Sequence, residues 1–169
     1  MIFREMRRKR QQLSDAECEE IFSRCTSGTL ALLGDGGYPY ALPISYVYAN
    51  RQIYFHSAVE GHKIDAIKAC NKASFCVIAQ DDVKPQKFTT YFRSVIAFGH
   101  IGIVDDATEK LEAAKLLARR YAPGDEAGML AELDKGLHRM VIIRLDIEHL
   151  SGKQAIELQK ERMRMNMGG

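Results

Sequence analysis

The segment from residue 28 to residue 58 alternates β-prone runs with two short clusters of turn residues. The clusters are Gly34-Asp35-Gly36-Gly37 and Ala49-Asn50-Arg51. The runs between them are rich in aliphatic and tyrosine side chains, which favour strands over helices. Because each cluster separates two such runs, the segment predicts three strands of an antiparallel meander.

Three more β-prone segments follow along the chain. They read "ASFCVIAQ" from residue 73, "KFTTYFRSVIAFGHIGIV" from residue 87 and "RMVIIRLDIEHL" from residue 139. The second is too long and too rich in β-branched and aromatic residues for a helix. Its glycines at 99 and 102 indicate a bend or a bulge. Long bent strands are typical of barrels, so at least six strands of a mainly β fold are expected.

Capping signals and apolar spacing predict three helices around these strands. Ser14 and Glu17 have the spacing of a capping box, Asp106 is an N-cap for a later helix, and Asn71 is a plausible left-handed residue after the middle helix. The expected ranges are 15 to 25, 61 to 70 and 106 to 121. The polar tail 151–169 is expected to be a C-terminal helix or arm, and the whole chain 1–169 a single domain.

Composition excludes several classes of protein. The 24 basic and 22 acidic residues give a formal net charge of +2, which does not indicate a nucleic-acid-binding protein. The four cysteines contain no CxxC pair, so neither disulfides nor a metal site is expected. No apolar run is long enough to span a membrane, and no secretory signal is recognisable. We therefore expect a cytoplasmic protein with reduced thiols, no metal and no membrane partner.

The corner Gly61-His62-Lys63 carries the clearest chemical signal of the sequence. A chain that leaves a strand at His56-Ser57-Ala58 and enters a helix after Gly61 presents free backbone N–H groups at the positive end of the helix dipole. Lys63 adds a positive charge to these donors, so the corner suits a phosphate group. The other interpretation is an ordinary helix start facing solvent, because neither a P-loop nor a GxGxxG motif is present.

The sequence around this corner resembles a known family. The run "GYPYALPISYVYANRQIYFHSAVEGHKIDAIKACNKASFCVI" is similar to the pyridoxamine-5′-phosphate-oxidase-like superfamily of FMN-binding split barrels, and in particular to its nitroimidazole-reductase-like branch. The resemblance extends to "MRRKRQQLSDAECEEI", "YFRSVIAFGHIGIV" and "IEHLSGK", and so covers most of the chain. It implies a six-stranded antiparallel split β-barrel with flanking helices.

The resemblance also implies which residues contact the FMN cofactor. The basic pair that binds the phosphate corresponds to His62 and Lys63, and the residues beside the ribityl chain and the phosphate correspond to His56, Ser57 and Ala58. Backbone contacts to the flavin ring correspond to Pro43, Ile44 and Ser45. The side chain at the pyrimidine edge corresponds to Ser94, next to Val95. No catalytic side chain is identified.

In this superfamily FMN lies between two subunits, so the resemblance implies a homodimer with flavin at the interface. Two functions remain open. One is an FMN-dependent oxidoreductase that reduces small electron-poor substrates, with NADH or NADPH as a candidate electron donor. The other is a non-catalytic flavin- or haem-binding protein that serves as a sensor or a store.

Overall fold

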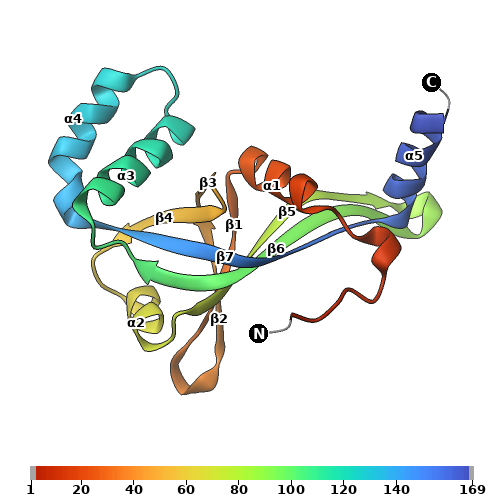
Figure 1. Cartoon of the computed structure of the whole chain (residues 1–169), viewed down its shortest axis with the longest axis horizontal. Coiled ribbons are helices and arrows are strands. Elements are labelled where there is room, and N and C mark those ends of the chain that lie inside the picture. The colour runs from red at the N-terminus through yellow and green to blue at the C-terminus, as the bar shows by residue number, and fades with distance from the viewer. Residues whose placement is uncertain (1–2, 168–169) are drawn as a thin grey trace.

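The structure, a computed structural model, describes residues 3–167 and consists of one antiparallel sheet with helices at its ends and sides (Figure 1). The strands are β1 (Ser27–Leu33), β2 (Pro39–Ser45), β3 (Val47–Ala49), β4 (Gln52–Ala58), β5 (Lys72–Lys84), β6 (Thr89–Ile103) and β7 (Met140–Gln154). The α-helices are α1 (Asp15–Arg24), α2 (His62–Ala69), α3 (Ala107–Tyr121), α4 (Glu126–Gly136) and α5 (Ile156–Met167). Short 3-10 turns include η1 (Lys9–Gln11).

The strand order explains why the sheet forms a split barrel. The order is β2-β1-β5-β6-β7-β4-β3, and every neighbouring pair is antiparallel. β2 and β3 lie at opposite ends of this order, yet only Tyr46 separates them in sequence. The sheet must therefore curl until its edge strands β2 and β3 meet at Tyr46. An opening remains between β2 and β4. The predicted split barrel is confirmed.

The number of strands differs from the prediction. The structure has seven strands rather than six, because the segment predicted as one strand between the two turn clusters breaks at Tyr46 into β2 and β3. The Tyr46 side chain is fully buried and its hydroxyl donates to the Phe22 carbonyl (2.8 Å). Its backbone N–H donates to the hydroxyl of Tyr121 (2.9 Å). These contacts from distant helices hold the residue at which the chain changes strand partners.

The core of the barrel is aromatic and is covered by two helices. Phe22 of α1, Tyr46, Phe55 of β4 and Phe75 of β5 pack together at its centre, with ring centroids of Phe55 and Phe75 5.1 Å apart. α2 contributes Ile64, Ala66 and Ile67 to the same cluster. A second, smaller cluster joins α3 and α4 to the outer side of β4 and β7 through Tyr54 and Ile142. The barrel and the α3–α4 pair thus have separate hydrophobic cores.

The helices α1, α2 and α3 begin and end within one residue of the predicted ranges. The capping box of Ser14 and Glu17 is present, and the Asp106 carboxylate accepts the N–H of Glu109 (2.7 Å). α2 ends at Ala69, but Asn71 does not have a positive φ, so the predicted left-handed stop is wrong. Residues 151–154 continue strand β7 instead of starting a helix or arm, and the C-terminal helix α5 begins at Ile156.

Candidate functional site

The corner between β4 and α2 has the geometry of an anion site. Gly61 is the N-cap of α2 and has a φ of 120°, a conformation that side-chain-bearing residues rarely adopt. Among residues 3–167, no side chain caps this helix start. Since the first N–H groups of a helix have no partner within the helix, the donors of His62 and Lys63 remain available to a ligand.

Lys63 is the main positive charge of this corner. Its side chain is half-buried, and burial lowers its pKa; burial is the only cause of the shift, with no charged group contributing among the described residues. A half-buried ammonium without a counter-ion is unfavourable by itself, because desolvation penalises the charged form. An anion bound at the start of α2 would relieve this penalty.

His62 is held by the loop between β1 and β2. Its ring stacks on Tyr40 of β2 with centroids 4.1 Å apart and planes 14° from parallel. Its Nε2 lies 3.6 Å from the Oδ2 of Asp35. Tyr40 and Asp35 were not predicted, because nothing in the sequence shows that the β1–β2 loop folds against α2. Their contacts place β2 beside the β4–α2 corner.

His56, Ser57 and Ala58 do not point in one direction, because side chains alternate along a strand. Ser57 is buried, whereas His56 and Ala58 are exposed on the outer side of the barrel. His56 lies on the wall of a cavity of about 240 Å³, which α3 and β7 also line with apolar side chains such as Leu117 and Met140. The imidazole therefore borders a small apolar space.

Pro43, Ile44 and Ser45 end the edge strand β2. β1 is its only neighbour in the sheet, so one backbone edge of β2 faces the opening of the barrel. Proline is tolerated in such edge strands because its lack of a backbone N–H removes no hydrogen bond between central strands. The free edge leaves backbone groups of β2 without a partner strand.

Ser94 and Val95 lie in β6, away from the corner. Val95 is fully buried in the core, which leaves only its backbone for a ligand. Ser94 is on the outer face, where its cross-strand neighbours are Ile78 and Lys153. In the pairing with β7, His56 lies opposite Ile142 and Ser94 lies opposite Lys153. These two residues of β7 are eleven positions apart in the sequence. The separation along that strand is roughly 36 Å, longer than an FMN molecule.

Figure 1 shows the same separation, with β7 crossing the molecule from the α3–α4 pair to α5. One subunit thus brings the residues of β2, β4 and α2 together but keeps Ser94 apart from them.

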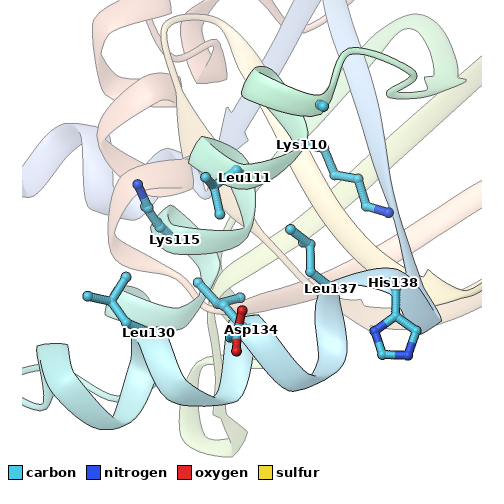
Figure 2. A pocket seen from close by; sticks show the side chains of 9 residues that line it. Lys110, Leu111, Lys115, Leu130, Asp134, Leu137 and His138 are labelled. Carbon is cyan, nitrogen blue, oxygen red and sulfur yellow. The ribbon is translucent and has the colours of Figure 1, made fainter.

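A second cavity, of about 620 Å³, lies between α3 and α4. Figure 2 shows Leu111, Leu130 and Leu137 along it, with Lys110 and Lys115 on the α3 side. None of the residues predicted to contact flavin lines this cavity. We assign it no part in the flavin site.

Cysteines and metal-binding groups give no further site within the described part of the chain. All four cysteines are free, and burial raises the pKa of Cys18 to about 12, so its thiol is inert at neutral pH. Residues 3–167 contain no group of three or more His, Cys, Asp or Glu side chains arranged to hold a metal ion. In the same range, no helix combines the length and the apolar character of a transmembrane span.

Comparison with known proteins defines the family. The sequence model of the pyridoxamine 5′-phosphate oxidase family matches residues 14–154, and the chain therefore belongs to this family. No curated protein sequence matches the chain. The family expected from the sequence motifs is confirmed.

Solved structures share the fold at low identity. A protein of Bacteroides thetaiotaomicron named for 5-nitroimidazole antibiotic resistance matches with a TM-score of 0.72 and 20% identity, over 84% of this chain and 85% of that one. An FAD- and haem-binding protein of Mycobacterium smegmatis matches with a TM-score of 0.74 and 23% identity, over 86% and 73%. An FAD-binding protein of Mesorhizobium loti matches with a TM-score of 0.61 and 26% identity, over 86% and 97%.

Proposed function

We propose that this protein is an FMN-dependent oxidoreductase that reduces small electron-poor substrates. The observation that carries the proposal is the uncapped start of α2 beside the half-buried, unpaired ammonium of Lys63. These groups fit a phosphate, in a fold for which two similar structures are named for binding a flavin. Bound FMN would supply the redox chemistry, and the protein would orient it and control access to it.

The fit extends from the phosphate to the ring. With its phosphate on Lys63 and the first turn of α2, the flavin would lie across the opening between β2 and β4. The free edge of β2 at Pro43–Ser45 would offer backbone hydrogen bonds to the ring. His56 and the apolar cavity of about 240 Å³ beside it form a candidate substrate pocket. A cavity of this size is below the usual range of roughly 300–1,000 Å³ for ligand pockets, which favours a small substrate.

The position of Ser94 supports a site shared between two subunits. Ser94 is too far along the sheet to reach a flavin held at the β4–α2 corner of its own subunit. A partner related by a two-fold axis could bring its own Ser94 to the ring. The outer face around Ser94 includes Ile78, which is 66% exposed, and it could be covered in the same contact.

A dimer is therefore expected in solution. Light scattering should give a mass near twice that of the 19.1 kDa chain. The flavin should bind in two equivalent copies per dimer. A monomer that retains flavin at full affinity would contradict the shared site, because the contacts from Ser94 and Val95 of a second subunit would be missing from it.

A change at Ser94 tests which part of the flavin it contacts. If its hydroxyl reaches the pyrimidine edge, Ser94→Ala should shift the reduction potential of the bound flavin more than its affinity. One hydrogen bond there interacts differently with the oxidised and the reduced ring. Potentiometry of the wild type and the variant measures the effect. An unchanged potential would place Ser94 away from the ring.

The second candidate is a non-catalytic flavin- or haem-binding protein. It is favoured by the similar structure that is named for binding both FAD and haem. The absorption spectrum of the purified protein distinguishes flavin from haem, and titration with FMN and FAD distinguishes the two flavins. Turnover with NADH or NADPH and a panel of nitroaromatic acceptors tests the reductase. Flavin binding without turnover would favour the second candidate.

A further inference from the structure

The chain preceding α1 forms a basic surface at the end of the molecule opposite α2. Its turn η1 is closed by a hydrogen bond from the Gln11 N–H to the Arg8 carbonyl (2.9 Å). Gln12 then bridges Lys153 of β7, and the Leu13 N–H donates to Gly152 (2.9 Å). These bonds fix the segment against the last residues of β7, near the start of α5 (Figure 1).

A cavity of about 460 Å³ lies between this segment and α5. The residues that line it are Arg7, Arg8, Lys9, Arg10, Gln11 and Ile156. Four consecutive basic residues thus line one open hollow, largely through the aliphatic parts of their side chains, with an aliphatic side chain from α5 beside them. The volume is larger than a phosphate ion needs and falls in the range of small-ligand sites.

The positive charge of this cavity is largely uncompensated. Lys9 pairs with Glu5 (2.7 Å). Among the described side chains, no carboxylate lies within 4 Å of the guanidinium groups of Arg7, Arg8 or Arg10.

Of the acidic groups nearby, Glu17 pairs with Arg162. Glu157 and Glu161 of α5 raise the pKa of Lys87 in the β5–β6 hairpin from longer range, and neither lies within 4 Å of a cation of the cavity. Three cations therefore remain without partners around the hollow.

Three buried polar atoms without partners lie on residues of this segment and of the adjoining ends of β6 and β7, and one of them belongs to the cavity wall. Gln154 is 1% exposed, and its Oε1 accepts from Arg93 Nη2 (3.2 Å). Its Nε2, the Nε of Arg93 and the Oε1 of Gln11 are buried without a hydrogen-bond partner among the described residues. Gln11 is 5% exposed and belongs to the cavity wall. Because unpaired buried polar groups are rare, the free Oε1 of Gln11 is an acceptor that a hydroxyl group of a ligand in the cavity could satisfy.

We propose that this cavity binds a small molecule that carries a diphosphate, of the nucleoside diphosphate class. Guanidinium groups bind phosphate oxygens with paired hydrogen bonds, and Arg7, Arg8 and Arg10 together match the charge of about −3 of a terminal diphosphate. The remaining volume and the side chain of Ile156 fit the nucleoside part. The residues that line the cavity lie apart from the β4–α2 corner, and none of them is among those predicted to contact flavin.

Titration calorimetry of the full chain at low salt, with excess FMN present throughout, tests the proposal. We expect saturable binding of one ADP per chain, weaker binding of AMP and none of adenosine. Arg8→Ala should weaken ADP binding about tenfold or more, because a charge-assisted hydrogen bond is lost. The matched control is Lys9→Ala, which removes a charge from the same turn but one that already pairs with Glu5. It should change the affinity much less.

Three results would overturn the proposal. Equal losses of ADP affinity in Arg8→Ala and Lys9→Ala would mean that the general positive charge of the segment attracts ADP and that no specific site exists. If single-stranded oligonucleotides bind more tightly as their length increases, and ADP binding does not saturate, the segment is a surface that binds polyanions non-specifically. Displacement of FMN by ADP would place ADP in the flavin site. Lys63→Ala, which tests the flavin site separately, should leave the ADP affinity unchanged.

Discussion

Lys63→Ala is expected to weaken FMN binding about 10-fold to 150-fold and to leave riboflavin binding nearly unchanged. The substitution removes a charge-assisted hydrogen bond to the phosphate, worth about 1.5–3 kcal/mol. Riboflavin has no phosphate, so it cannot lose this contact. For the same reason, raised salt should weaken FMN binding more than riboflavin binding. Titrating the apoprotein with both flavins, followed by flavin fluorescence, measures all of these quantities.

The matched control is Lys68→Ala, which removes an exposed lysine from the last turn of the same helix. It should leave FMN affinity within about twofold of the wild type, since a screened surface charge contributes little. Folding should not suffer in Lys63→Ala, because burial already lowers the pKa of the Lys63 ammonium and makes its charge unfavourable without a ligand. Equal losses for FMN and riboflavin would contradict the assignment of Lys63 to the phosphate.

Gly99→Ala is expected to destabilise the fold by about 3 kcal/mol, in contrast to Gly102→Ala three residues later. Gly99 lies at the bulge between β6 and β7, and a Cβ atom there would overlap the backbone carbonyl oxygen of Asp146. Backbone cannot move aside as a flexible side chain can. At Gly102 nothing lies within 4 Å of an added Cβ, so alanine there should stabilise the strand by about 0.5–1 kcal/mol.

Urea denaturation of both glycine variants measures the two effects, which have opposite signs. Both changes add the same methyl group to the same strand, so any general effect of alanine cancels in the comparison. A similar loss of stability in both variants would contradict the structural reason given for Gly99. The sequence indicated a bend or bulge at both glycines, and the structure places the bulge at Gly99 alone.

Features encoded by neighbouring residues were predicted well. The capping box needs only Ser14 and Glu17, and the turn after β3 needs only Asn50 and Arg51, which both have positive φ values. The break at Tyr46 could not be predicted in this way. It depends on hydrogen bonds to Phe22 and Tyr121, residues 24 and 75 positions away in the chain.

Two features near the C-terminus were missed for similar reasons. α4 contains Gly128 and ends at Gly136, which weakens its helical pattern, and it is held by the burial of Met129 and Leu133 against α3 and the sheet. The end of β7 contains Gly152, which can be taken for a turn residue. In the structure it is a strand residue, at which an added Cβ atom would collide with the Sγ of Cys18.

For the candidate site, the sequence names residues, and the structure gives their arrangement. The sequence identified the β4–α2 corner, since its signal is a continuous stretch ending in Lys63. The contacts of Tyr40 and Asp35 with His62 depend on how the β1–β2 loop folds, and only the structure gives them. Likewise, only the strand register shows that Ser94 lies far from His56 within one subunit.

The position of β7 in the sheet has a consequence for synthesis of the chain. β4 and β6 are both neighbours of β7, but they are complete by residue 103, whereas β7 begins at Met140. While the intervening residues are being translated, both strands have an unpaired edge of the kind that promotes association between chains. Only the arrival of β7 covers both edges at once. The nascent protein therefore depends on its last strand to escape aggregation, and this is the interval in which a chaperone would have most effect.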